Sequence, residues 1–338
     1  MPLQQSEQEL GKDIVALADG VLDRSRRALA QAITLIESTR SDHRAAASAL
    51  LERLIPYAGK SMRLGISGVP GVGKSTFVEA LGNHVIDAGH RVAVLTVDPS
   101  SAISGGSILG DKTRMELLSR RSEAYIRPSP AGKTLGGVTR RSREALILCE
   151  AAGFDVIIVE TVGVGQSETK VADMTDMFVL LLLPGAGDEL QGIKRGIMEL
   201  ADLILINKAD DDLLTLADRA TAEYRNALRL LQPRSPNWKV AVQTCSARDG
   251  TGIAEAWEVA LRHREMLDAS GQFTARRAEQ ARDWMWSEVN ENLITALQSD
   301  PQVRKQIPAL EAAASEGRIP PNIAARQLLE IFLNRHKQ

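Results

Sequence analysis

Residues 68–76 carry the most specific chemistry in this chain and read Gly-Val-Pro-Gly-Val-Gly-Lys-Ser-Thr. This run matches the complete phosphate-binding pattern GxxxxGK[ST], in which glycines let backbone N–H groups approach a phosphate closely. Lys74 would place a positive charge beside the outer phosphates, and the Ser75 hydroxyl could bind Mg²⁺. The residues expected to surround the phosphates are Gly68, Val69, Pro70, Gly71, Val72, Gly73, Lys74, Ser75 and Thr76.

A second motif, Asn207-Lys-Ala-Asp210, predicts which base is bound. It follows the short apolar run 203–206, and ligands of α/β sheets lie at the carboxyl ends of such strands. An aspartate carboxylate accepts hydrogen bonds from both the ring N–H and the amine of guanine, a pair that adenine lacks. Ser246-Ala247 resembles the loop that packs against the guanine base in GTPases. The residues expected at the base are Asn207, Lys208, Asp210, Ser246 and Ala247.

Three carboxylates at expected strand ends or beside a flexible run are candidates for Mg²⁺ and for sensing the γ-phosphate. Glu160 ends the expected strand 155–160 and, with Gly163, forms an ExxG version of the usual DxxG motif. Asp98 and Asp111 bracket the glycine- and serine-rich run 99–110, as a nucleotide-sensing switch requires. The alternative is that Asp98 only forms a turn and Asp111 only caps a helix. The expected metal ligands are Ser75, Asp98, Asp111 and Glu160.

The residue after Gly163 is Val164, where many GTPases place a glutamine that orients water. Gln166 lies out of register, so we predict slow intrinsic hydrolysis that a partner stimulates. Lys194, in the glycine-rich loop 184–195, could be moved toward the transferred phosphoryl group, although a solvated lysine explains it equally well. The expected catalytic residues are Lys74, Asp98, Asp111, Glu160 and Lys194.

Composition indicates a globular α/β protein with no nucleic-acid or membrane role. The 338 residues are 44% hydrophobic and 25% charged, and a net charge of -2 supplies no basic field for nucleic acid. The longest apolar run, 177–183, is too short to span a bilayer. The amino-terminal residues have no signal-peptide pattern, and Cys149 and Cys245 lack metal-ligand spacing. We therefore expect a cytoplasmic protein.

The order of apolar and amphipathic segments predicts three regions, 1–60, 61–267 and 268–338. The first is a helical extension in which Leu29, Ile33 and Ile36 share one face, as do Ala47, Leu51 and Leu54. The second alternates strands with helices, which predicts a mostly parallel sheet with helices on both faces. Its expected strands are 62–67, 91–97, 124–127, 155–160, 177–183, 203–206 and 239–244, with a helix over 77–88 after the phosphate loop.

The third region is helical again and carries an apolar stripe. The stripe consists of Ala278, Ala281, Met285, Val289 and Leu293, beside Trp284 and Trp286. Such a face can pack on the chain's own core or form a dimerisation arm. The sequence leaves these two alternatives open.

Five motifs together resemble the MeaB/ArgK-type GTPases, relatives of the methylmalonic aciduria type A protein. They are residues 68–76, Val97-Asp-Pro-Ser-Ser101, Gly110-Asp-Lys-Thr-Arg-Met115, Glu160-Thr-Val-Gly-Val-Gly-Gln166 and Asn207-Lys-Ala-Asp210. They agree with the family in order and spacing, and the similarity covers nearly the whole chain. The resemblance implies a P-loop GTPase of the metallochaperone-like branch, a homodimer formed through the carboxyl-terminal arm.

The resemblance also implies a partner and residue roles. The client would be adenosylcobalamin-dependent methylmalonyl-CoA mutase or a relative such as isobutyryl-CoA mutase. The GTPase would gate the loading of the cofactor onto this mutase and protect the mutase from inactivation. Lys74 and Ser75 match the phosphate lysine and metal ligand, and Asn207 and Asp210 match the guanine readers. Asp98, Asp111 and Glu160 match the metal and switch carboxylates. The loop 185–195, with Lys194, resembles the partner-sensing switch.

Two other functions are compatible with a guanine-nucleotide site. One is metal insertion, as in the hydrogenase and urease accessory GTPases, but the five histidines are scattered and neither cysteine lies in a ligand motif. The other is a GTP-dependent protein kinase, which would require an acceptor pocket that the sequence does not identify. Both remain alternatives to the mutase chaperone.

Overall fold

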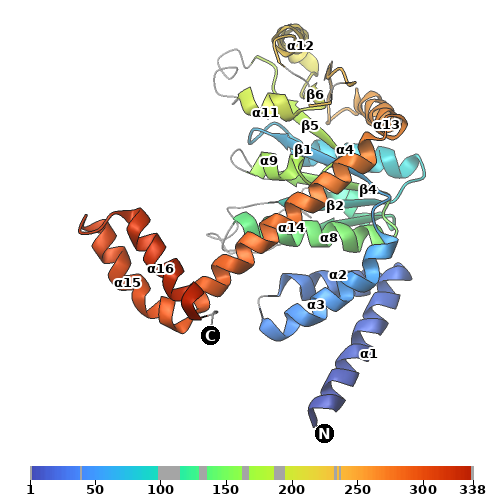
Figure 1. The fold of residues 1–338 in the computed structure, drawn as a ribbon. Coiled ribbons are helices and arrows are strands. Elements are labelled where there is room, and N and C mark those ends of the chain that lie inside the picture. The colour runs from blue at the N-terminus through green and yellow to red at the C-terminus, as the bar shows by residue number, and fades with distance from the viewer. Residues whose placement is uncertain are drawn as a thin grey trace. The chain divides into compact units, whose positions relative to one another are not determined.

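The computed structural model describes residues 2–38, 40–97, 115–128, 135–161, 167–185, 195–231, 234–235 and 237–335 (Figure 1). The chain divides into two compact units, Met1–Arg277 and Ala278–Gln338. The first unit contains the sheet and all described motif residues.

The centre of the first unit is a seven-stranded sheet in the order β3-β2-β4-β1-β5-β6-β7, and all pairs are parallel. The strands are β1 Met62–Gly68, β2 Val92–Val97, β3 Ala124–Arg127, β4 Val156–Thr161, β5 Met177–Leu182, β6 Leu203–Ile206 and β7 Ala241–Thr244. All seven expected strands are therefore present, and the predicted fold class is confirmed. The largest difference is at β7, which begins two residues later than expected because pairing with β6 starts at Ala241.

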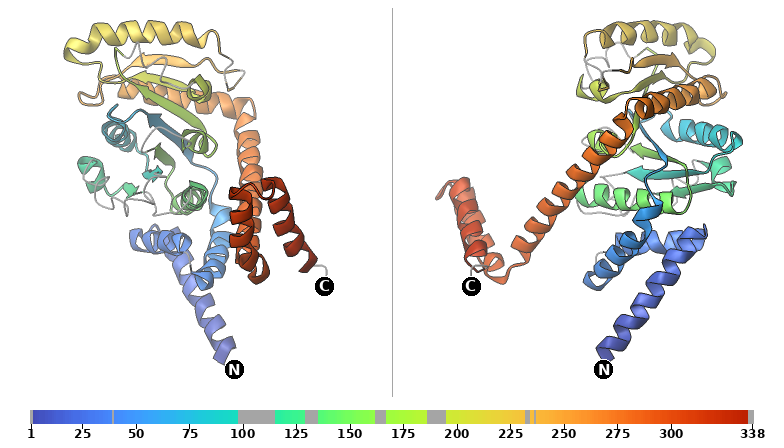
Figure 2. Two further views of the ribbon diagram at one scale, coloured as in Figure 1. Left: turned by 90° about the vertical axis from the view of Figure 1, so that its left-hand side faces the viewer. Right: turned by 45° about the vertical axis from the view of Figure 1, so that its right-hand side comes forward.

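Helices cover both faces of the sheet, as the views in Figure 2 show. Alternate strand residues point to opposite faces, so that Leu64 and Ile158 pack with one core cluster while Ile157 and Phe178 pack with another. Because both faces are buried, the strands are apolar along their whole length. The covering helices are α4 Lys74–Asp87, α7 Glu116–Arg120, α8 Leu135–Ala151, α9 Ser167–Ala172, α11 Arg195–Leu200, α12 Leu214–Leu228 and α13 Ile253–Ala269.

The amino-terminal extension is helical, as expected, and packs beside α8. It consists of α1 Pro2–Leu22, α2 Arg26–Glu37, α3 Ser41–Leu54 and the short η1 Ile55–Tyr57. The α2 face that was predicted from Leu29, Ile33 and Ile36 is buried. In α3 the fully buried residues are Ala46, Leu50 and Leu54, whereas Ala47 and Leu51 are only half-buried. Ala47 and Leu51 pack against the same core cluster as Leu54, so the predicted face is confirmed, although the most buried neighbours, Ala46 and Leu50, lie one position earlier.

The second unit contains most of α14 Gln272–Ser299, followed by α15 Pro301–Ser315 and α16 Pro321–Arg335. Asp300 caps α15, since its carboxylate accepts hydrogen bonds from the Gln302 and Val303 amides. The apolar stripe of α14 remains exposed: Met285 is 52% exposed and Leu293 is 56% exposed. No helix in the described part of the chain has the length and apolar character needed to cross a bilayer.

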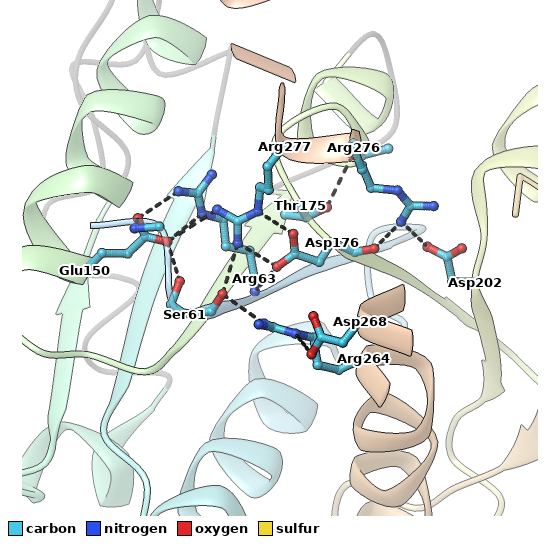
Figure 3. Close-up of polar contacts among 12 residues, drawn as sticks. Ser61, Arg63, Glu150, Thr175, Asp176, Asp202, Arg264, Asp268, Arg276 and Arg277 are labelled. Atoms are coloured by element: carbon cyan, nitrogen blue, oxygen red, sulfur yellow. Dashed lines mark hydrogen bonds and ion pairs between the residues drawn. The ribbon is translucent and has the colours of Figure 1, made fainter. Parts of the chain in front are cut away.

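A buried network of ion pairs connects Arg276 and Arg277, in the second turn of α14, to the amino-terminal ends of the strands (Figure 3). The Arg277 guanidinium binds both carboxylate oxygens of Asp176, at 2.6 and 2.7 Å, and lies 3.4 Å from Glu150. Arg63 binds Glu150 through two further bonds of 2.9 and 2.8 Å. Burial alone would raise the pKa of Glu150, but the charges of Arg63 and Arg277 hold that pKa below its ordinary value.

Candidate active site

The phosphate loop connects the end of β1 at Gly68 to the start of α4 at Lys74. Two of its positions require glycine. Gly68 has a φ of 154°, and a Cβ there would lie 2.5 Å from the Leu181 carbonyl oxygen. Gly73 has a φ of 94°, and a Cβ there would lie 2.8 Å from the Asn207 amide nitrogen. The loop therefore packs directly against the strands that carry the other motifs.

The Lys74 side chain is buried inside this loop. Its ammonium donates hydrogen bonds to the carbonyl oxygens of Gly68 at 2.7 Å and of Val69 at 3.1 Å. Burial lowers the pKa of Lys74, while the negative charges of Glu160 and Glu168 act in the opposite direction. The loop itself thus holds the lysine at the amino-terminal end of α4, and such helix ends favour anions.

Ser75 and Glu160 meet across the gap between α4 and β4. The Ser75 hydroxyl donates to Glu160 Oε1 at 3.0 Å, and the Glu160 residue is 4% exposed. The register of β1 with β4 pairs Ile66 with Glu160, which places this carboxylate beside the phosphate loop. A hydroxyl and a carboxylate are oxygen ligands of the kind that Mg²⁺ prefers, so these residues fit the expected metal.

Asn207 joins the phosphate loop to the loop that follows β7. Its amide nitrogen donates to the Val72 carbonyl oxygen at 2.8 Å, and its amide oxygen accepts from the Ala247 backbone N–H at 3.1 Å. The residue is 1% exposed. Both ends of the amide therefore bind backbone groups, and Asn207 acts as a strut between two loops.

Asp210 lies beside that strut at the surface of the same loops. Its Oδ2 accepts a 2.7 Å hydrogen bond from the Ser246 hydroxyl. The Arg248 guanidinium lies 3.6 Å from Asp210 Oδ1 and 2.8 Å from Asp211. Sequence reasoning missed Arg248, although its position directly after Ser246-Ala247 was a usable signal.

The structure thus brings together two groups of predicted residues at the carboxyl ends of β1, β4, β6 and β7. The first group is Lys74, Ser75 and Glu160, and the second is Asn207, Asp210, Ser246 and Ala247. The other residues of the phosphate loop, 68–73 and 76, and Lys208 beside Asn207 are also described, whereas Asp98, Asp111, Gly163 and Lys194 lie outside the described residues. A phosphate loop joined through Asn207 to the loop after β7 fits the arrangement expected of a P-loop GTPase.

Comparison with known proteins identifies the family. The model of the family described as methylmalonyl-CoA mutase-associated GTPase MeaB matches residues 29–302. The chain belongs to the MeaB family of GTPases. It binds guanine nucleotide and hydrolyses GTP to GDP and phosphate.

Named relatives of this MeaB-family GTPase cover nearly its whole length. The GTPase ArgK of Escherichia coli is 45% identical over 97% of this chain and 98% of its own. The mitochondrial methylmalonic aciduria type A homolog of Mus musculus is 50% identical over 95% of this chain and 80% of its own. A crystal structure titled as a LAO/AO transport system kinase is 38% identical, with a TM-score of 0.76 over 95% of this chain and 97% of that chain.

Proposed function

We propose that this MeaB-family GTPase gates the loading of adenosylcobalamin onto methylmalonyl-CoA mutase, or onto a related acyl-CoA mutase, and protects that enzyme from inactivation. The observation that carries the proposal is the family match over residues 29–302, whose description names a mutase-associated GTPase. The similarity to the methylmalonic aciduria type A homolog supports the same client. The assembled phosphate and base loops supply the GTP-dependent step.

The proposed roles of the residues follow from their contacts. Lys74 would bind the outer phosphates from inside its loop, as its burial there allows. Asp210 would read guanine, with Ser246 fixing the orientation of the carboxylate. Asn207 would hold the two loops at the spacing that a guanine nucleotide needs.

Ser75 and Glu160 would hold Mg²⁺, together with Asp98 and Asp111. The ion, when bound, supplies positive charge that stabilises the transferred phosphoryl group. Glu160 would also orient the Ser75 hydroxyl through their shared hydrogen bond. Gly163 would report the γ-phosphate, and Lys194 would supply a positive charge only when the client is bound.

We further propose a homodimer formed through the region 268–338 and a cytoplasmic location. The exposed stripe of α14, in which Trp286 is 57% exposed, supports the dimer because large apolar faces on soluble helices usually bind a partner. Light scattering on a Leu293→Asp variant should then report a monomer. Cys149 and Cys245 are free buried thiols, which fits a reducing compartment.

Steady-state GTP hydrolysis, measured with and without an adenosylcobalamin-dependent acyl-CoA mutase, tests the function. We expect slow hydrolysis by the protein alone and a stimulation of tenfold or more by the mutase, which corresponds to about 1.4 kcal/mol of activation free energy. A Lys194→Ala variant should keep the basal rate and lose the stimulation. If the mutase does not change the rate of GTP hydrolysis by the natural chain, the client assignment is wrong while the GTPase assignment stands.

A further inference from the structure

The loop that follows β6 holds the proposed guanine reader, Asp210, in a strained stretch of backbone. Lys208 has a φ of 60° and Asp211 has a φ of 46°. Arg24 is the one other non-glycine residue with a positive φ in the part of the chain that the structure describes. Left-handed conformations of this kind are unfavourable for residues with side chains, and they persist only where surrounding structure holds them. The backbone around Asp210 therefore depends on contacts from outside its own loop.

A short turn after β7, residues 246–249, supplies such contacts. The Ser246 hydroxyl donates to Asp210 Oδ2 at 2.7 Å and accepts the Asp249 backbone N–H at 3.2 Å. One hydroxyl group thus binds both the Asp210 carboxylate and the turn itself. The side chain of Arg248 projects from this turn, so its position is linked to that of Asp210.

The Arg248 guanidinium lies among three carboxylates where the two loops meet. Its Nη2 donates to Asp211 Oδ2 at 2.8 Å, and its Nε donates to Asp249 Oδ1 at 2.9 Å. Nη2 also lies 3.6 Å from Asp210 Oδ1, which is longer than a hydrogen bond, so this oxygen can still accept a hydrogen bond from a base. Within the described ranges, no other ion pair involves any of these three carboxylates.

The guanidinium compensates negative charges that would otherwise repel one another. Hydrogen bonds to Asp249 and Asp211 raise the pKa of Arg248, and the charge of Asp210 raises it further. The bond to Arg248 in turn lowers the pKa of Asp249. The Asp210 side chain is 13% exposed, whereas the Arg248 side chain is 60% exposed. The positive charge beside the half-buried reader is therefore supplied by a surface residue, which can be replaced without disturbing the core.

We propose that Arg248 is a positioning residue for guanine nucleotide. It connects the loop of Asp210 and Asp211 to the turn 246–249, compensates the charge of the Asp210 carboxylate, and thereby slows release of the bound nucleotide. The inference rests on the proposed guanine-reading role of Asp210. Arg248 acts through the two aspartates, and not by contact with the base.

The rate of GDP release from the full chain tests this inference. The protein is loaded with the fluorescent N-methylanthraniloyl derivative of GDP, and the loss of fluorescence is followed after addition of excess unlabelled GDP. Arg248→Ala should release the nucleotide at least about threefold faster than the natural chain, a modest factor because exposed ion pairs are weak. This ratio should shrink between about 0.1 M and about 1 M salt, where the Debye length falls from about 10 Å to about 3 Å.

Two further variants separate positioning from general effects of surface charge. Asp211→Asn removes the carboxylate that Arg248 binds at 2.8 Å, and asparagine tolerates the left-handed backbone. In this background Arg248→Ala should accelerate release by a smaller factor, because the two residues act together. Arg120→Ala is the matched control: the Arg120 side chain is 70% exposed and pairs with Glu116 in its own helix. It should release GDP as the natural chain does.

Several results would overturn the inference. Arg248→Ala could accelerate release by less than about threefold, or could slow it, which would mean that Arg248 competes with the base for Asp210. Its effect could also stay undiminished in 1 M salt or in the Asp211→Asn background, which would mean that an ion pair with Asp211 is not the cause.

Competition between GDP and xanthosine diphosphate (XDP) in Asp210→Asn separates this inference from the role on which it rests. If Asp210→Asn favours XDP while Arg248→Ala releases GDP at the natural rate, only the role of Arg248 is wrong. If Asp210→Asn keeps the natural preference for GDP, the proposed guanine reader is itself wrong.

Discussion

Replacing Arg277 with methionine should strongly destabilise the first unit. The substitution keeps the unbranched stem of the side chain but removes both bonds to Asp176, the 3.0 Å bond to the Ser61 carbonyl oxygen and the ion pair with Glu150. Glu150 keeps its two bonds to Arg63, so most of the cost falls on Asp176, whose side chain is 2% exposed. Asp176 would retain one backbone bond, from Arg63 N at 2.8 Å.

The size of the effect follows from the burial of both partners. Removing one partner of a buried ion pair costs about 3–5 kcal/mol, because the other charge is left without compensation. The Arg277 side chain is 14% exposed, so water can offset only a small part of this cost. Because Asp176 keeps its bond from the Arg63 backbone N–H, we expect a loss near the lower end of that range, about 3 kcal/mol in the free energy of unfolding.

Equilibrium unfolding in urea, followed by circular dichroism, measures this loss. The slope of the transition should be compared between variants, because a changed slope would mean that more than stability has changed. Arg282→Met is the control: Arg282 is 65% exposed and lies 3.8 Å from Glu279, and such surface pairs contribute about 0–1 kcal/mol. Adding Asp176→Asn to Arg277→Met should recover part of the loss, since a neutral amide needs no counter-charge. A loss below about 1 kcal/mol in Arg277→Met would refute the reasoning.

Three further predictions concern the site and the network. Asp210→Asn should weaken GDP binding by at least about 100-fold and favour XDP, since the amide donates where the guanine amine needs an acceptor; unchanged selectivity in competition binding would contradict the assignment. Asn207→Ala leaves the Val72 carbonyl and the Ala247 N–H without their partner, at about 1–3 kcal/mol each, so GDP binding should weaken by tenfold or more. Its preference between GDP and XDP should stay the same, and a changed preference would mean that Asn207 contacts the base. The lowered pKa of Glu150 stabilises the fold above the ordinary value of 4.5, and this stability is lost as the pH falls through the lower folded value. Acid titration of unfolding should therefore be less steep in Glu150→Gln.

The nucleotide chemistry could be read from sequence because each motif is local. The phosphate loop needs glycines, a lysine and a hydroxyl at fixed spacing, and the flanking β1 and α4 were recognisable from their own patterns. The seven strands were found for the same reason, since apolar runs of strand length bounded by loops are a property of neighbouring residues. The sequence also identified the α3 face that packs on the core, although the most buried residues there, Ala46 and Leu50, lie one position before Ala47 and Leu51.

Contacts between distant residues were decided only by the tertiary structure. Asn207 reaches Val72 across 135 positions, and Arg277 reaches Glu150 across 127. Arg24, just before α2, and Arg91, just before β2, both lie close to Gly153. These contacts depend on the strand order and on where α2 and α14 pack. The sequence does not decide them, because many arrangements of the same helices and strands bury similar apolar area. The sequence by itself therefore determined the GTP chemistry, whereas the link made by Asn207, the buried ion-pair network and the approach of Arg24 and Arg91 to Gly153 became visible only when the sheet order brought their elements together.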